Sequence, residues 1–202
     1  MATVKARVGG AWVEVPINGA VRFGGVYLPF GSTPPPTGQS LFTDADLAGA
    51  NTDFLDSGGG PLTLGTVLRP SVPGQVTKGR WRFPDTDTGS SVKFVLYDYA
   101  TEARLAEATF VAPTWGAWNE VDLPVPASLV ATQDVVACVY QSTANPRYIT
   151  DPGFFTAGKV SGVLSAPASS EIPNGRFTMS DTFPTGSFGS TCYFPDIVFI
   201  PD

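Results

Sequence analysis

The chain of 202 residues contains no histidine, and this absence excludes several kinds of chemistry. Ser-His-Asp and Cys-His catalysis, histidine general bases and zinc sites that need an imidazole ligand are all ruled out. Cysteine is nearly as rare, because Cys138 and Cys192 are the only two and no Cys-x-x-Cys motif is present. Redox motifs and cysteine-rich metal motifs are therefore excluded as well. A disulfide would need the two Cα atoms within about 7 Å, and we expect two free, buried thiols instead.

Charged side chains are also scarce, at 15% of the residues against about 25% in an average soluble protein. The 12 Lys and Arg are outnumbered by 18 Asp and Glu, which gives a net charge of -6. Such a chain is a poor partner for nucleic acid, whose phosphates attract Lys and Arg. No apolar run reaches the roughly 20 residues of a membrane-spanning helix, and none follows the first basic residues as in a secretory signal. We therefore expect no nucleic-acid partner, no membrane partner and no signal peptide.

Glycine and proline are abundant, and together they disfavour a helical fold. The 22 Gly and 19 Pro are too many helix breakers for a bundle or a coiled coil. Short alternating segments between Gly/Pro turns predict an all-β fold, an antiparallel jelly-roll-like β-sandwich. Residues 134–140 are apolar on both faces and are predicted to form the most buried central strand. The other predicted strands cover 76–83, 91–97, 104–111, 118–123, 175–179 and 193–200.

Only one segment, residues 43–50, has the pattern of a helix. Thr43 is its expected N-cap, and Asp46 stands three residues further on, as in a capping box. A single short helix leaves the all-β prediction unchanged.

The first thirty residues contain an internal repeat. Arg7-Val8-Gly9-Gly10-Ala11-Trp12 realigns with Arg22-Phe23-Gly24-Gly25-Val26-Tyr27, and the Arg and Gly-Gly positions are identical. Gly-Gly between two short alternating runs predicts a two-residue hairpin turn in each copy. Two such hairpins are too small to bury their own aromatic side chains. They either fold back on their own domain or dock onto other chains, and we favour docking through Trp12, Val13, Tyr27, Leu28 and Phe30.

A proline-rich stretch separates this repeat from the rest of the chain. Three consecutive prolines at 34–36 favour an extended, rather stiff spacer. The predicted organisation is a docking arm over 1–31, a linker over 32–39 and a sandwich domain over 40–202.

Acidic residues are the only candidates for acid–base chemistry. Asp85 and Asp87 lie in an Asp-Thr-Asp-Thr-Gly segment that resembles the start of a calcium loop but lacks the Glu that completes one. A turn capped by Asp side chains is the favoured interpretation. Glu120 and Asp122 share the exposed face of one strand, where carboxylates are mostly solvated rather than a glycosidase pair. With no phosphate loop or nucleophile elbow, we expect no catalytic residue, no metal and no cofactor.

Aromatic residues near predicted turns are the candidate ligand-binding residues. Trp115 and Trp118 lie where a turn enters a strand, and Arg147 and Tyr148 form a second pair in a loop. An exposed aromatic ring stacks on the flat apolar face of a sugar, so these four residues are a candidate glycan site. Packing is the alternative for each, above all for Trp118, which is typical of a core residue. A glycan site would need Trp115 and Tyr148 exposed together in one groove.

Two stretches resemble known families. The segments Trp118-Asn119-Glu120-Val121-Asp122-Leu123, Asn174-Gly175-Arg176-Phe177 and Cys192-Tyr193-Phe194-Pro195-Asp196 resemble a β-sandwich domain of unknown function found in secreted multidomain bacterial proteins. This resemblance covers about 41–200 and implies no catalytic residues. Pro195 departs from the pattern and indicates an edge position or a bulge in the last strand. The Val-Gly-Gly-Ala-Trp-Val repeat is separately similar to the openings of tail and other virion proteins of bacteriophages that infect Actinobacteria.

Together these resemblances imply a structural virion protein of a tailed bacteriophage, in a minor tail or fibre-like position. The arm would anchor it to other virion proteins and to copies of itself. A homotrimer is expected, because symmetric copies can bury one another's aromatic residues. The sandwich would face outward for attachment to the host surface, in a particle assembled in the host cytoplasm. The alternatives are a glycan-binding module for host recognition and a capsid decoration protein, and an enzyme is the least expected.

Overall fold

The computed structural model describes residues 3–8, 11–16, 20–23, 26–29, 37–87, 89 and 91–202. By its internal contacts the chain divides into two units, Met1–Thr37 and Gly38–Asp202. Each unit is described by itself. Most of the expected linker, residues 32–36, lies outside the described residues, whereas Gly38 and Gln39 belong to the second unit.

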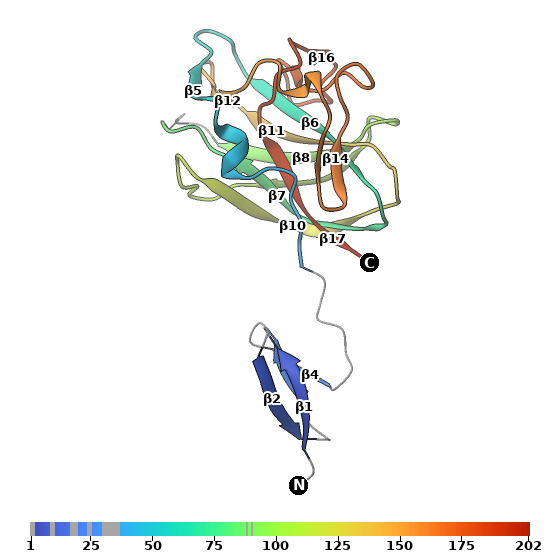
Figure 1. The fold of residues 1–202 in the computed structure, drawn as a ribbon. Helices are drawn as coiled ribbons and strands as arrows, with labels where there is room; N and C mark the ends of the chain where they lie inside the picture. The colour runs from blue at the N-terminus through green and yellow to red at the C-terminus, as the bar shows by residue number, and fades with distance from the viewer. Residues whose placement is uncertain are drawn as a thin grey trace. The chain divides into compact units, whose positions relative to one another are not determined.

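The first unit contains the strand pairs of the two predicted hairpins, whereas the predicted Gly-Gly turns at 9–10 and 24–25 lie outside the described residues. Strand β1 (Thr3–Val8) pairs antiparallel with β2 (Ala11–Pro16), and β3 (Ala20–Phe23) pairs antiparallel with β4 (Val26–Pro29). Figure 1 shows both pairs in blue.

The register of the hairpins follows the sequence repeat. Trp12 lies opposite Arg7, and Tyr27 lies opposite Arg22. Of the expected docking residues, Val13 and Leu28 also lie on these strands, while Phe30 falls outside the described residues. Docking through this unit stays a prediction.

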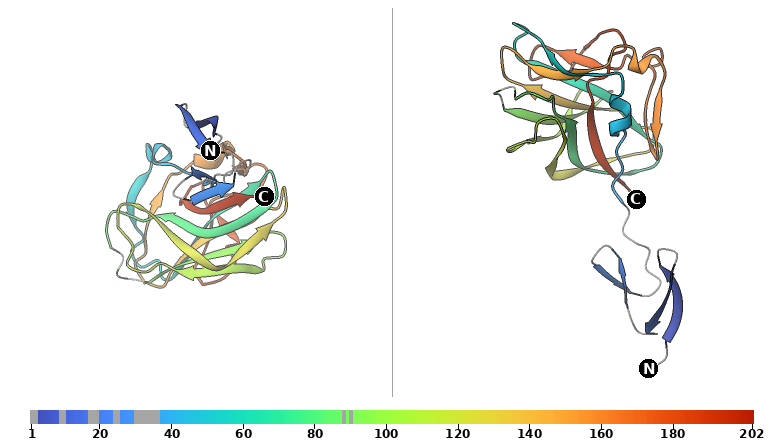
Figure 2. Two further views of the ribbon diagram at one scale, coloured as in Figure 1. Left: turned by 90° about the horizontal axis from the view of Figure 1, so that it is seen from below. Right: turned by 60° about the vertical axis from the view of Figure 1, so that its left-hand side comes forward.

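The second unit is a sandwich of antiparallel sheets, which confirms the predicted fold class (Figure 1). The smaller sheet has the order β10-β7-β17, with β10 (Trp118–Leu129), β7 (Gly74–Arg82) and β17 (Pro195–Pro201). The larger sheet has the order β13-β14-β6-β11-β8-β9. Its strands are β13 (Lys159–Ser161), β14 (Leu164–Ala166), β6 (Leu62–Pro70), β11 (Val135–Gln141), β8 (Val92–Asp98) and β9 (Arg104–Thr109). Figure 2 shows the sandwich from two further directions.

Shorter elements complete the second unit. A two-stranded sheet joins β5 (Asn51–Leu55) to β12 (Arg147–Thr150), and β15 (Arg176–Thr178) pairs with both β6 and β16 (Gly186–Ser187). Two 3₁₀ turns, η1 (Asp44–Leu47) and η2 (Phe154–Thr156), are the only helical elements among the described residues.

Large apolar side chains from both sheets fill the space between them. Trp81 and Phe83, which share one face of the predicted strand 76–83, are fully buried. At Gly79 a Cβ atom would lie only 2.1 Å from Cγ of Phe94 on β8. The ring of Phe94 therefore occupies the place that a side chain on β7 would take. Burying one such apolar side chain stabilises the fold by about 1.5–3 kcal/mol, so this core carries much of the stability.

The central strand was predicted correctly. β11 lies between β6 and β8, and every residue in it except Tyr140 is buried. Cys138 and Cys192 are both free and buried, as expected. The edge position inferred from Pro195 is also confirmed, because Pro195 opens β17, an outer strand of the smaller sheet.

The helix expected over 43–50 is wrong in extent and type. Only the short 3₁₀ turn Asp44–Leu47 forms, although Thr43 and Asp46 make the expected capping box. After Leu47 the chain turns at residues 48–49, where Gly49 is a poor helix former, and it then enters β5 at Asn51.

Asn174 completes the larger sheet where β6 changes its neighbour. β6 pairs with β14 at Arg69 and Pro70 and with β15 at 63–65. Between these contacts, the Val67 N–H donates to Asn174 Oδ1 at 2.9 Å, and Asn174 Nδ2 donates to the Val67 carbonyl at 3.1 Å. The side-chain amide thus takes the place of a missing strand residue.

Asp196 fastens the start of the second unit to its last strand. Its buried carboxylate accepts the backbone N–H groups of Leu41 and Phe42, each at 3.1 Å, and that of Ile197 at 2.8 Å. Arg80 completes the cluster, with NH1 2.8 Å from Oδ2. We call this arrangement the Asp196 clamp. The buried charge is therefore fully hydrogen-bonded and paired, as buried charges require.

Candidate functional site

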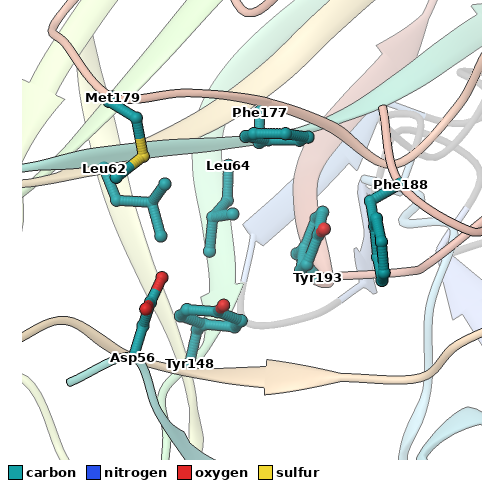
Figure 3. Close-up of a pocket in the computed structure, with 8 residues that line it drawn as sticks. All are labelled: Asp56, Leu62, Leu64, Tyr148, Phe177, Met179, Phe188 and Tyr193. Carbon is teal, nitrogen blue, oxygen red and sulfur yellow. The ribbon is translucent and has the colours of Figure 1, made fainter. Parts of the chain in front are cut away.

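A small pocket lies where the β5–β12 sheet meets the β6 and β15 edge of the larger sheet. It has a volume of about 190 Å³. Its lining residues are Asp56, Leu62, Leu64, Tyr148, Phe177, Met179, Phe188 and Tyr193 (Figure 3). We call it the aromatic pocket, because four of these eight side chains carry rings.

Leu62 and Leu64 form the buried base of this pocket. They are two positions apart on β6 and so face the same side of the sheet. Both are nearly inaccessible to solvent. Figure 3 shows Phe177 and Tyr148 on opposite sides of Leu64, with Tyr193 to one side. Aliphatic and aromatic surface therefore surrounds the cavity on several sides.

Two tyrosine hydroxyl groups bring polar chemistry to this apolar pocket. The rings of Tyr148 and Tyr193 meet edge to face, with centroids 5.6 Å apart. Burial raises the pKa of Tyr148 well above its ordinary value, and the Asp56 charge raises it further. Burial likewise raises the pKa of Tyr193, to about 12. Both hydroxyl groups are therefore protonated at neutral pH, where each can donate and accept a hydrogen bond.

Asp56 is the only charged residue that lines the pocket. It opens the Asp-Ser-Gly-Gly-Gly loop after β5, and the Gly59 N–H donates to the Asp56 carbonyl at 3.2 Å. A Cβ at Gly59 would lie 2.5 Å from Cγ of Asp56. Because Gly59 has no side chain, the Asp56 carboxylate can occupy the space that a Cβ atom at residue 59 would fill. A carboxylate only accepts hydrogen bonds.

The rim of the aromatic pocket is apolar and open to solvent. Phe188 is 69% exposed and Met179 is 51% exposed. The Phe54 ring is also partly exposed and contacts Tyr148, with centroids 5.2 Å apart. Clustered exposed apolar side chains mark surfaces that bind something. With its hydroxyl groups and carboxylate, this pocket is suited to a small ring-shaped ligand with polar edges.

Arg147 and Tyr148, predicted to act as a pair, do not line the same pocket. Tyr148 lines the aromatic pocket, whereas Arg147 NH1 lies 2.8 Å from Oδ2 of Asp53 in an ion pair. Successive residues of a strand face opposite sides, and both residues belong to β12. Arg147 is therefore not part of the pocket lining.

Trp115 lies in a different pocket. That second cavity has a volume of about 380 Å³ and is lined in part by Asp87, Phe110 and Trp115. The Trp115 ring also packs edge to face on the buried Phe83, with centroids 5.2 Å apart. Trp115 and Tyr148 thus do not share the single groove that the predicted glycan site required.

Trp118 is held by polar partners and packs against the core. The Arg80 guanidinium lies 3.8 Å from the centre of its ring, and Trp118 Nε1 donates to Asp44 Oδ1 at 2.8 Å. Its ring also contacts the main hydrophobic cluster. The packing interpretation therefore accounts for Trp118 without a ligand.

The acidic residues singled out in the sequence have structural partners. Glu120 and Asp122 both face Lys78, with Nζ to carboxylate distances of 3.1 Å and 3.6 Å. Asp87 accepts the Gly89 N–H at 2.7 Å, and Asp85 accepts the Thr52 hydroxyl at 2.7 Å. Within the described ranges, no cluster of three or more acidic or cysteine side chains is placed to hold a metal ion.

Most residues of the aromatic pocket were missed by the sequence analysis. The glycine run at 58–60 was an available signal for Asp56, since a run of glycines allows a side chain to fold back over the backbone. Phe188, between Ser187 and Gly189, was an available signal for an exposed ring. Phe177 and Tyr193 carried no local signal, because long-range strand pairing brings them to the pocket.

The fold and the aromatic pocket define an all-β sandwich domain with a small cavity lined by aromatic side chains. Residues 49–195 match the model of a protein family described as a domain of unknown function (DUF4082), and the chain belongs to this family. All eight lining residues fall within the matched segment. No curated protein matches the chain. In the part of the chain that the structure describes, no helix combines the length and the apolar character needed to cross a bilayer.

Proposed function

We propose that the sandwich is a sugar-binding domain that serves attachment to a host cell surface, and that the chain is a structural component of a tailed-phage particle. The observation that carries the sugar-binding part is the aromatic pocket. Its rings offer flat apolar surface, while Tyr148, Tyr193 and Asp56 offer polar contacts at its edge. A sugar ring has the same combination of an apolar face and a polar rim.

The size of the pocket supports a single ring as the ligand. Pockets for drug-sized molecules span about 300–1,000 Å³, and this one is smaller, at about 190 Å³. Its exposed rim leaves room for the rest of a longer chain to extend into solvent. A terminal residue of a cell-surface polysaccharide fits this description.

The chemistry of the pocket supports binding rather than hydrolysis. Glycosidases position two carboxyl groups about 5–10 Å apart across the scissile bond. Asp56 is the single carboxylate among the lining residues. We therefore propose a non-enzymatic role.

The test is direct measurement of binding, by glycan array and by titration of bacterial cell-wall polysaccharide onto the full chain. Phe188→Ala removes an exposed ring from the rim, and we expect it to weaken binding about tenfold, or about 1.4 kcal/mol. Trp115→Ala, in the separate cavity, is the matched control and is expected to bind as the wild type does. Silence across the array, or equal binding by both variants, would refute the proposal.

The virion part of the proposal rests on the arm. Its support is the sequence repeat, whose two copies contain the antiparallel strand pairs β1–β2 and β3–β4, in a unit with its own internal contacts. Deleting residues 1–36 is expected to abolish assembly into particles and any trimer, while circular dichroism still reports a folded sandwich. Normal incorporation of the shortened chain would contradict anchoring by the arm. The number of copies per particle separates a minor tail component from a capsid decoration protein.

A further inference from the structure

We infer that the aromatic pocket selects neutral and amino sugars and excludes acidic ones, with Asp56 as the specificity-determining residue. This inference rests on the proposed sugar-binding function and names the class of ligand. It starts from the charge balance of the lining, where one carboxylate faces two neutral hydroxyl groups and no cation.

The Asp56 carboxylate is available to a ligand. Among the described residues Asp56 forms no ion pair, and the Tyr148 hydroxyl group is a side-chain partner near its carboxylate, whereas nearby Asp53 is paired with Arg147 at 2.8 Å. Arg147 is thereby committed outside the pocket. The negative charge of Asp56 is consequently the uncompensated charge that an entering ligand meets.

The loop that carries Asp56 is fastened to the segment leading into β12. The Asp56 N–H donates to the Pro146 carbonyl at 3.0 Å, and the Gly58 N–H donates to Asn145 Oδ1 at 3.0 Å. A third bond runs from the Gly60 N–H to the Ala144 carbonyl at 3.2 Å. Because residues 144–146 lead directly to Tyr148, these bonds hold the loop backbone at Asp56 in place beside the segment that carries the Tyr148 ring. A site that is already formed before binding loses less entropy when the ligand arrives.

Hydrogen-bond complementarity then decides which sugars fit. A carboxylate only accepts hydrogen bonds, so it is matched by neighbouring sugar hydroxyl groups or by a sugar ammonium group. The hydroxyl groups of Tyr148 and Tyr193 both donate and accept, so they match the remaining ring oxygens. A uronic or sialic acid would instead bring a second negative charge against Asp56 in a partly desolvated pocket, where like charges repel strongly.

Gly59 acts as a positioning residue for Asp56. A methyl group there would meet the carboxylate, with 2.6 Å to each of its oxygens. Gly59→Ala is therefore expected to displace the carboxylate without changing the charge of the pocket. It should weaken neutral-sugar binding and leave the rejection of acidic sugars largely in place, a split that a purely structural defect would not produce.

The experiment compares glucose-, glucosamine-, glucuronic acid- and sialic acid-terminated oligosaccharides on the full chain by array and calorimetry. We expect the wild type to bind the first two at least a hundredfold more tightly than the last two. Asp56→Asn should weaken binding of the neutral sugar about tenfold and reduce the neutral-to-acidic ratio by at least tenfold. Asp122→Asn, which removes an exposed carboxylate on β10, is the charge-matched control and should leave the ratio unchanged.

The outcomes separate this inference from the proposed function. Equal binding of acidic and neutral sugars, or an unchanged ratio in Asp56→Asn, overturns the selectivity while sugar binding that is sensitive to Phe188→Ala still stands. Absence of binding to every sugar overturns both.

Discussion

Replacing Asn174 with alanine tests whether one side chain completes the larger sheet. Asn174 is 0% exposed, and its amide satisfies both backbone groups of Val67, which is itself fully buried. Asn174 Nδ2 also donates to the Pro167 carbonyl at 3.3 Å, and Asn174 Oδ1 accepts the Gly175 N–H at 2.8 Å. Alanine removes all of these contacts and leaves a buried N–H and a buried carbonyl on β6 without partners.

The expected loss in the free energy of unfolding follows from the unpaired N–H and carbonyl groups of Val67. Each buried, unsatisfied polar group costs about 1–3 kcal/mol, so the two groups of Val67 together predict a loss of about 4 kcal/mol. With a urea dependence of about 2 kcal/mol/M, the unfolding midpoint would fall by about 2 M. A domain with about 5–15 kcal/mol of stability remains folded after such a loss.

Equilibrium urea unfolding, followed by tryptophan fluorescence to which the buried Trp81 contributes, measures this loss. Asn145→Ala is the matched control, because it removes an amide whose oxygen accepts one backbone N–H, from Gly58, at an exposed position. We expect the control to cost less than about 1 kcal/mol. If Asn174→Ala costs no more than the control, the side chain does not substitute for a strand residue and our account of β6 fails.

Three further predictions concern the core, the pH dependence and the thiols. Gly79→Ala places a methyl group against Phe94 and should destabilise the sandwich by about 1–3 kcal/mol; an unchanged thermal midpoint would contradict the packing described. Hydrogen bonds from Gln133 and Thr101 lower the pKa of Asp98. Its contribution is therefore present above pH 4 and is lost as the pH falls below that value. The wild type should lose more stability than Asp98→Asn between pH 6 and pH 3, and parallel losses would refute this. Burial raises the pKa of both Cys138 and Cys192 well above the ordinary value, so neither thiol should react with a thiol reagent until urea unfolds the chain, and rapid labelling of the folded chain would contradict this.

The sequence predicted the strands whose side chains alternate clearly or are apolar throughout. The segment 134–140 became the central strand β11, and 76–83 became β7. The nine-residue strand β6 was missed, because Gly65 interrupts its pattern and glycine is unfavourable inside strands. The structure gives the reason for this glycine, since a Cβ there would lie 2.9 Å from Cys138 Sγ on β11. That contact joins segments far apart in the chain, so no local pattern could indicate it.

The candidate site was predictable only in part for a similar reason. Tyr148 was singled out as a ring beside a turn, and it lines the aromatic pocket. Asp56 was not, because its position depends on the pairing of β5 with β12 and on bonds to residues 144–146. Trp115 and Trp118 were near one another in the sequence, yet one lines a separate cavity and the other lies against Arg80. Proximity in sequence showed which rings exist, but only the tertiary fold decides which of them meet.

The Asp196 clamp has a mechanical consequence for the attachment role that we propose. Tension transmitted from residue 37 would reach the short segment 39–42 first. Gln39 exchanges two backbone hydrogen bonds with Phe199, at 2.7 Å and 2.8 Å, and the clamp then secures Leu41 and Phe42. Several bonds must therefore rupture before the pull could begin to unravel the sandwich. Segment 39–42 would therefore resist a pulling force on residue 37 while the sandwich stays bound to its ligand.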